Sequence, residues 1–196
     1  MRDYEAVVAF HGHSCPGLAM GYRVAAAAMT AMHLTEISED EEFLAIVEND
    51  SCAVDAIQVV TGCTFGKGNL LLRDYGKQSY TFVRRSDSKA VRICVDYLPP
   101  KETAEDTEMW RRYSAGDKSA EVLAVIRARK AKKVQFVLAV PQPELLKITD
   151  VVVAIPPEAR IYPSIRCEAC HEKMAEAKAR VKDGKIVCIP CSATVT

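Results

Sequence analysis

The sequence is poor in aromatic residues and carries no net charge. Aromatics make up 7% of its 196 residues, with a single tryptophan, and 26 basic residues balance 26 acidic ones. A chain without a basic excess is not built to bind polyanions over its whole surface. Hydrophobic residues still make up 49% of the chain, which is enough to bury a real core. The composition is therefore that of a globular protein.

Long hydrophobic runs are also missing. The longest apolar stretch, residues 24–32, is short and rich in alanine. A membrane-spanning helix needs roughly 20 apolar residues. Residues 1–8 contain charged side chains before any apolar run, unlike a secretory signal peptide. We therefore expect a soluble, cytoplasmic protein with no membrane partner.

Histidine is scarce, with four residues, but cysteine is not, with eight. In a cytoplasmic protein, cysteines indicate metal sites or reactive thiols rather than disulfides. The positions of these two residue types therefore direct the search for function.

The pattern of hydrophobic blocks predicts an α+β fold with a mixed or antiparallel sheet and packed helices, followed by a small treble-clef-like zinc ribbon. Residues 3–10 and 134–141 are compatible with either helix or strand. Pro156 and Pro157 begin a linker, which divides the chain into a core domain over 1–157 and a zinc-ribbon domain over 158–196. The predicted helices cover 16–33, 51–61, 103–114 and 117–133, and the predicted strands cover 43–48, 69–75, 80–86, 90–98 and 151–156.

The tail contains two Cys-x-x-Cys pairs separated by 17 residues: Cys167, Cys170, Cys188 and Cys191. Four thiolates in such pairs are typical of structural zinc, and a unit this small depends on the metal to fold. We expect residues 171–180 to be helical, followed by a hairpin that turns at Asp183-Gly184. "CEACH" (167–171) also matches a haem c attachment motif, but the second Cys-x-x-Cys pair and the missing export signal favour zinc.

The segment "FHGHSCPG" (10–17) holds two of the four histidines. As an extended segment, it would present His11, His13 and Cys15 on one face, because side chains alternate along a strand. Pro16 then begins a helix, which places Cys15 at a helix N-terminus, where a thiol pKa is lowered. Two interpretations remain open: a core metal site, most simply zinc, or a structural turn.

Two further cysteines could join this group. Cys52 lies at the start of the predicted helix 51–61, and Cys63 follows its end. Eleven helical residues span roughly 16 Å, so Cys52 and Cys63 cannot share one ion. We favour Cys52 as the additional ligand, because two helix N-termini can converge on one anionic cluster.

The glycine-rich stretch after that helix resembles a phosphate loop but lacks the required spacing. We interpret it as a tight turn that positions Cys63 or Lys67. The candidate catalytic residues are therefore Cys15, Cys52 and Lys67. Asp50, Asp55 and Gln58 are the polar side chains expected to support them.

Three segments, 10–23, 50–70 and 159–191, resemble the formylmethanofuran dehydrogenase E-subunit family. The resemblance implies an α+β core with a cysteine/histidine cluster, a zinc-ribbon tail and a homodimer. Family members occur beside a molybdenum or tungsten enzyme of one-carbon metabolism, and also in organisms that lack that pathway. This chain has no evident molybdopterin-binding motif, so we do not expect dehydrogenase activity of the isolated chain.

Three functions fit the sequence. The favoured one is an accessory metal-binding protein of molybdenum, tungsten or one-carbon metabolism, with a partner such as a molybdoenzyme. The second is a metal-dependent enzyme that acts on a small-molecule ligand through zinc-activated water or a thiolate. The third is a zinc-ribbon regulator that binds protein or nucleic acid, although the tail has few aromatics and only a mild basic excess, which disfavours nucleic acid.

Overall fold

A computed structural model describes residues 1–99 and 101–193 of the chain. It divides into two compact units, Met1–Glu158 and Ala159–Thr196. The predicted α+β class is confirmed, since the described residues of the first unit combine six helices with a five-stranded mixed sheet. No helix in the described part combines the length and the apolar composition that a bilayer crossing requires.

The sheet of the first unit has the strand order β2-β1-β3-β4-β5. Strands β1 and β2 run parallel, and every other neighbouring pair is antiparallel. The parallel pair is joined through helix α3, as a parallel connection requires a crossover. The strands are β1 (Phe43–Val47), β2 (Leu70–Leu72), β3 (Ser79–Arg84), β4 (Ala90–Val95) and β5 (Leu146–Asp150).

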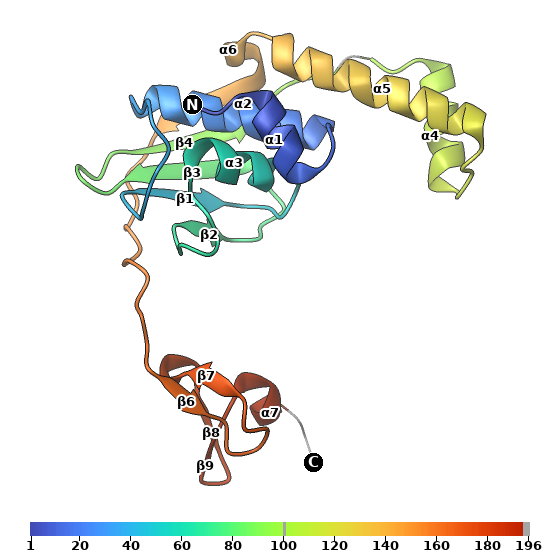
Figure 1. Ribbon diagram of the computed structural model, residues 1–196. Helices are drawn as coiled ribbons and strands as arrows, with labels where there is room; N and C mark the ends of the chain where they lie inside the picture. The colour runs from blue at the N-terminus through green and yellow to red at the C-terminus, as the bar shows by residue number, and fades with distance from the viewer. Residues whose placement is uncertain (100, 194–196) are drawn as a thin grey trace. The chain divides into compact units, whose positions relative to one another are not determined.

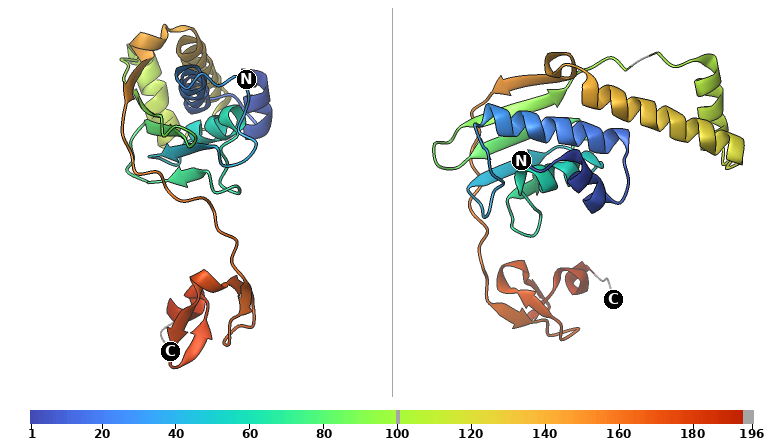
Figure 2. Two further views of the ribbon diagram at one scale, coloured as in Figure 1. Left: turned by 90° about the vertical axis from the view of Figure 1, so that its left-hand side faces the viewer. Right: turned by 45° about the horizontal axis from the view of Figure 1, so that its top comes forward.

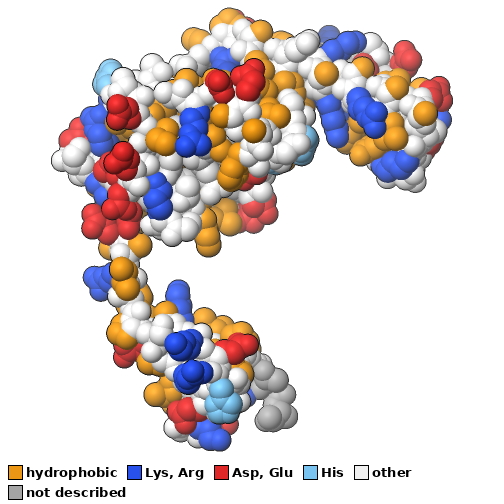
Figure 3. Space-filling model, viewed as in Figure 1, with side chains coloured by type: hydrophobic (Ala, Val, Ile, Leu, Met, Phe, Trp, Pro, Cys, Tyr) orange, Lys and Arg blue, Asp and Glu red, His pale blue; other side chains and the backbone are white. Residues whose placement is uncertain are grey.

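The first three helices cover one face of this sheet (Figure 1). Helices α4 and α5 form a hairpin that extends beyond the edge of the sheet (Figure 2). Lys and Arg side chains gather along this hairpin (Figure 3). The helices are α1 (Tyr4–His11), α2 (Pro16–Ala31), α3 (Ala53–Thr61), α4 (Ala104–Ser114), α5 (Ala120–Ala139) and the single turn α6 (Gln142–Leu145).

Strand β1 is buried along its whole length because both faces of the sheet are covered. Phe43, Ala45 and Val47 join the main core beneath the helices. Leu44 and Ile46 point to the other face and join a second apolar cluster. A strand covered on both sides has a continuous hydrophobic sequence rather than an alternating one, as "FLAIV" does.

The segment that covers the second face was predicted to be a strand over 151–156, and that prediction is wrong. The strand at this edge is β5, which precedes the predicted range, and its residues Leu146–Asp150 pair with β4. Val151, Val153 and Ile155 then pack against the second cluster while Val152 is fully exposed. The segment lies across the sheet rather than within it, so its apolar residues serve packing and not strand pairing.

Two ambiguous segments are helical. Residues 4–11 form α1, which Asp3 caps by accepting a hydrogen bond from the Ala6 N–H at 2.9 Å. Residues 134–139 continue helix α5 without a break. Arg23 on α2 explains how this helix is held, because its guanidinium donates to the backbone oxygens of Val137, Leu138 and Val140.

The second unit is built from two small hairpins and a short helix. Strands β6 (Ser164–Arg166) and β7 (Lys173–Ala175) pair, as do β8 (Arg180–Lys182) and β9 (Lys185–Val187), before helix α7 (Ile189–Ala193). The turn at Asp183-Gly184 is found as predicted, with both residues at positive φ. The helix expected over 171–180 is wrong. Pairing with β6 draws residues 173–175 into a strand, and only the single 3₁₀ turn η1 (Glu176–Lys178) follows.

Candidate metal centres

The turn between α1 and α2 brings two histidines and a cysteine together. Helix α1 ends at His11 because Gly12 adopts a left-handed conformation, with φ of 88°, and its N–H donates to the Val8 oxygen. The rings of His11 and His13 lie 4.6 Å apart between centroids. Each of His11, His13 and Cys15 offers one possible ligand atom, and these three atoms lie within 4.8 Å of one another.

The backbone conformation that groups these three side chains is not the extended one we predicted. We expected an extended segment with side chains of alternating direction, but His11 is the last residue of a helix and Gly12 reverses the chain. The hydroxyl groups of Tyr4 and Ser14 are hydrogen-bonded at 2.9 Å and tie the turn back to α1. The grouping of the three side chains therefore depends on the left-handed glycine, and not on strand geometry.

His11 has the environment of a metal ligand. Its Nδ1 lies 2.7 Å from Asp55 Oδ2 on helix α3. An ionised carboxylate only accepts hydrogen bonds, so Nδ1 is the donor to Asp55 and Nε2 is the ring nitrogen left for a metal ion. Nε2 is buried and has no hydrogen-bond partner among the described residues. A carboxylate that orients the outer nitrogen of a histidine is the usual support of a metal-binding imidazole.

Cys15 and Cys52 lie at the starts of two helices, and a Cβ placed on Gly17 of the first would lie 3.4 Å from Cys52 Cβ. Cys15 caps α2, with its Sγ 3.4 Å from the Leu18 N–H, and it is 9% exposed. Cys52 occupies the N-cap position of α3 but makes no capping hydrogen bond through its side chain. Burial, followed by the neighbouring Cys15 thiol, raises the pKa of Cys52. A helix N-terminus lowers the pKa of a thiol, but at Cys52 burial outweighs that effect.

Cys63 and Lys67 lie apart from this group and have other partners. Cys63 is fully buried, its thiol donates to the Phe43 oxygen at 3.3 Å, and burial raises its pKa to about 12. Lys67 Nζ donates to the Ser38 oxygen at 2.8 Å and to the Glu39 oxygen at 3.3 Å. In the described part of the chain, these contacts account for both side chains without a metal ion.

Asp55 also lines a cavity of about 210 Å³. Gln58 donates to Asp55 Oδ1 at 3.4 Å, so the carboxylate connects the cavity wall to His11. Phe65, which is 77% exposed, stands at its margin. The polar lining comes from Asn49, Asp50, Ser51, Asp55 and Gln58.

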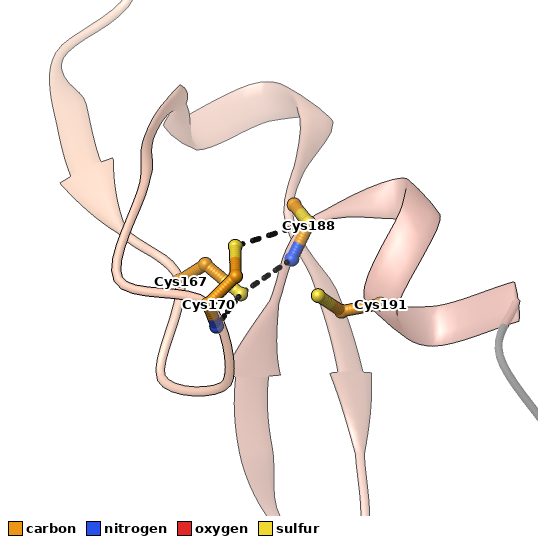
Figure 4. Close-up of side chains that lie close together, drawn as sticks. All are labelled: Cys167, Cys170, Cys188 and Cys191. Carbon is orange, nitrogen blue, oxygen red and sulfur yellow. Dashed lines mark hydrogen bonds between the residues drawn. The ribbon is translucent and has the colours of Figure 1, made fainter. Parts of the chain in front are cut away.

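The tail gathers its four cysteines into one cluster (Figure 4). The Sγ atoms of Cys170 and Cys188 lie 3.9 Å apart. The backbone N–H groups of Cys170 and Cys188 point at Cys167 Sγ, at 3.5 and 3.3 Å. Mainly through the Cys170 N–H, they lower the pKa of Cys167 to about 6. The neighbouring Cys188 thiol, first among several causes, raises the pKa of Cys191 to about 12. Such N–H bonds to thiolates are the normal support of a four-cysteine zinc site.

Comparison with known proteins now decides the family. The family model described as "FmdE, Molybdenum formylmethanofuran dehydrogenase operon" matches residues 10–147. This chain belongs to the FmdE family. The model of the prokaryotic dksA/traR C4-type zinc finger matches residues 160–194. The predicted family resemblance is therefore confirmed, and the tail of this FmdE-family chain is a C4-type zinc-finger domain.

Two relatives place this FmdE-family chain further. A probable S-adenosyl-L-methionine-binding protein of Archaeoglobus fulgidus is 36% identical over 192 residues, which cover 93% of this chain and 50% of the relative. The chain thus spans about half the length of this curated relative. The crystal structure of an FmdE-like protein of the tungsten formylmethanofuran dehydrogenase type, from Syntrophus aciditrophicus, shares the fold, with a TM-score of 0.58 and 22% identity. That match covers 96% of this chain and 89% of the other.

Sequence reasoning found the components of the core group but not how they are joined. Asp55 was predicted as a supporting residue, and the structure specifies its contact with His11. The Tyr4–Ser14 bond was missed, because nothing in the spacing of these residues signals it. The reversal of the chain after α1 did have one detectable sign, Gly12 after a helix-compatible segment, since a glycine there is the usual helix stop.

Proposed function

We propose that the core unit binds one metal ion through His11, His13 and Cys15, with Cys52 beside them. The observation that carries this proposal is the buried Nε2 of His11, which has no partner within the described residues while Asp55 holds Nδ1. Two imidazoles and a thiolate suit zinc and similar first-row metals. Three protein ligands would leave a coordination position open for water or a ligand.

The tail holds a structural zinc ion in this proposal. Support comes from its four converging thiols, the N–H groups that favour the thiolate of Cys167, and the match to a C4-type zinc finger. Such a site is closed, because protein ligands fill all four positions. Its role is therefore to fold the unit.

At the level of the cell, we propose an accessory metal-binding protein in molybdenum, tungsten or one-carbon metabolism. The family's link to a formylmethanofuran dehydrogenase operon supports this role. A homodimer and a partner such as a molybdoenzyme remain predictions of the family resemblance. The second candidate, a metal-dependent enzyme acting on a small molecule, is favoured by one observation: the polar cavity shares Asp55 with the histidine group.

Cobalt reconstitution tests the core site. Metal-free protein is titrated with Co²⁺, and the bound equivalents are counted from the visible absorption of tetrahedral cobalt and its thiolate charge-transfer bands. Wild type should take up two equivalents per chain, and His13→Ala should take up one. His33→Asn is the matched control, because it removes a histidine that lies outside the group and has a positive φ that asparagine tolerates. Equal uptake by wild type and His13→Ala would contradict the proposal.

A further inference from the structure

A second cavity, of about 260 Å³, shares Gln58 of helix α3 with the cavity that Asp55 lines. Among the described residues that line it, two are cationic, Arg2 and Lys67, and none is acidic. The other lining residues are neutral, and they include the exposed ring of Phe10. A concave site that presents two positive charges and no negative one favours an anionic ligand.

Neither cation has a carboxylate partner among the described residues. Lys67 Nζ donates to the backbone oxygens of Ser38 and Glu39, at 2.8 and 3.3 Å, which fix the ammonium group but do not neutralise its charge. An ammonium group has three N–H donors, so one remains for a ligand. For the Arg2 guanidinium, the described part of the chain shows no hydrogen bond or ion pair. Both positive charges are therefore available inside the cavity.

The acidic loop before β1 faces a different cavity. Glu36, Glu39, Asp40 and Glu42 line that other cavity, and none of them lines the one with the two cations. The Glu42 carboxylate is also engaged within its own loop, where it accepts from the N–H groups of Glu39 and Asp40 at 2.8 and 3.0 Å. This loop therefore supplies no counter-charge to the lining of the cationic cavity.

The glycine-rich loop after α3 contributes a side chain to this cavity rather than a row of backbone donors. The N–H groups of Thr64, Phe65 and Lys67 donate to Asn69 Oδ1, Gln58 Oε1 and Thr64 Oγ1 within the protein. In a true phosphate loop, successive N–H groups point at the ligand instead. An anion at this site would thus be held by charged side chains.

We propose that this cavity binds the anionic group of a small organic molecule, a carboxylate or a phosphate, through Arg2 and Lys67. The guanidinium can bind two oxygens of either group at once, and the ammonium adds a point charge of fixed position. Phe10, which is 61% exposed, provides an apolar wall for the carbon part of the same molecule. The ligand class is therefore an organic anion rather than an inorganic ion.

The cavity also borders the proposed core metal group. Phe10 directly precedes His11 in the chain. Gln58 donates to Asp55 Oδ1 at 3.4 Å, and the other oxygen of that carboxylate holds His11. A molecule anchored by Arg2 and Lys67 would therefore lie next to the proposed metal ligands. This consequence rests on the proposed function, whereas binding of the anion does not.

Titration of the full chain with benzoate and with phenyl phosphate tests the anion site. The protein carries one zinc equivalent for the tail, the ionic strength is low, and benzyl alcohol is the neutral analogue. Amide ¹H–¹⁵N chemical shifts give the affinity and locate the ligand. We expect both anions to shift the amides of residues 62–67, and tighter binding of one of them identifies the preferred group. Binding of benzyl alcohol as tight as that of benzoate would overturn the inference.

Charge-removing variants assign the binding to the two cations. Lys67→Met should weaken anion binding by about 10-fold, the loss of one charge-assisted hydrogen bond. Arg2→Gln should weaken it by about 3-fold, as expected for an exposed ion pair, and it keeps the test valid if Lys67→Met does not fold. Arg127→Gln is the matched control, because it removes an exposed positive charge of α5 outside the cavity. Equal affinity of wild type and Arg2→Gln would contradict the assignment.

Cobalt absorption tests the position of the ligand beside the core metal group. We expect benzoate to change the visible spectrum of cobalt-loaded wild type, and to change it less in Lys67→Met at the same benzoate concentration. An unchanged spectrum at saturating benzoate would overturn the position next to the metal and leave the anion site intact. If the core takes up no cobalt, the proposed metal site fails, and the titrations without cobalt still decide whether the anion site exists.

Discussion

At the scale of single residues, the His11 ring is held between two different environments. Asp55 accepts from Nδ1, and Nε2 is left buried without a partner among the described residues. Leaving a buried polar atom unsatisfied costs about 1–3 kcal/mol, so such an atom needs an explanation. A metal ion that is bound at Nε2 removes this cost and explains why the carboxylate sits where it does.

This role of Asp55 can be measured. Asp55→Asn should lower the affinity of the core for metal by about 10- to 100-fold, because the amide orients the imidazole less well and withdraws the support of a negative charge. Competition with a chromophoric chelator measures the affinity. Asp50→Asn is the matched control, since Asp50 lines the same cavity and the structure records no bond from it to His11. Equal effects of the two substitutions would contradict the assignment.

A second prediction at this scale concerns the pair Glu48 and Arg92. Glu48 is 6% exposed and accepts from both terminal nitrogens of Arg92, with Nη2 and Oε2 2.8 Å apart. The Arg92 hydrogen bonds hold the pKa of Glu48 below its ordinary value. A depressed folded-state pKa stabilises the fold above the unfolded pKa of about 4.3, and that stability is lost as pH falls through the folded pKa.

Arg92→Gln should therefore lower the free energy of unfolding by about 1.5–3 kcal/mol at neutral pH. Urea unfolding followed by circular dichroism gives this difference from wild type. The difference should shrink as pH falls below about 4, because protonated Glu48 no longer needs the cation. A difference that stays constant from neutral pH to pH 3 would show that the ion pair is not its cause.

At the scale of elements, the core site depends on the close packing of α2 against α3. A Cβ on Gly21 would lie 2.2 Å from the Ala53 backbone oxygen, closer than any real contact. The absence of a side chain at Gly21 thus lets the two helices approach. This approach also brings the start of α2, which follows its N-cap Cys15, close to Cys52 at the start of α3.

Gly21→Ala should destabilise the core unit by about 1–3 kcal/mol, because the helices must separate to admit the methyl group. The same variant should weaken core metal binding, since the caps move apart. Thermal unfolding and cobalt titration provide the two measurements. Gly17→Ala, in the same helix with an ordinary 3.4 Å contact, should be tolerated. Alanine favours a helix more than glycine does, so a loss of stability in Gly21→Ala cannot come from helix propensity. If Gly21→Ala is as stable as Gly17→Ala, the close packing at Gly21 does not have the importance assigned to it.

Elements with a clear hydrophobic pattern and local stop signals could be predicted from sequence. Helix α3 lies inside its predicted range of 51–61, and Gly62 ends it at positive φ. The strand expected at 151–156 could not be distinguished from a packing segment, because both need apolar residues, and only tertiary pairing with β4 separates them. The prediction of a helix over 171–180 is wrong for a related reason. The pairing of β7 with β6 overrides the helix propensity of residues 173–175.

For the candidate site too, some features could be predicted from sequence and others could not. The residue types of the core group could be selected from sequence because histidine and cysteine are grouped at a helix start. The partners of Cys63 and Lys67 could not, since both contacts join segments far apart in the sequence through backbone oxygens. The approach of the α2 start to Cys52 could not be predicted either, because it depends on how α2 packs on α3.

At the scale of the whole molecule, the two units should differ in how they depend on metal. The unit Ala159–Thr196 has two small hairpins, and Cys167 and Val187 are the buried apolar residues that the structure records in it. The first unit has a large apolar core of its own. A strong chelator should therefore unfold the tail and leave the core folded.

Limited proteolysis reads out this difference. With zinc, the tail should resist trypsin, and with chelator it should be cut at its own Lys and Arg residues while the core fragment persists. Acid should act in the same direction as the chelator, because protons compete with the metal for thiolates such as Cys167. A tail that stays protected in chelator at neutral pH would show that its fold does not require the ion.

Metal content per chain is the most direct test of the central claim that the core holds its own ion. Wild type and Cys167→Ser/Cys170→Ser are purified without chelator or histidine tag and measured by elemental analysis. The proposed core site predicts two ions in wild type and one in the double variant. One ion in wild type and none in the variant, with added metal failing to fill a second site, would contradict it.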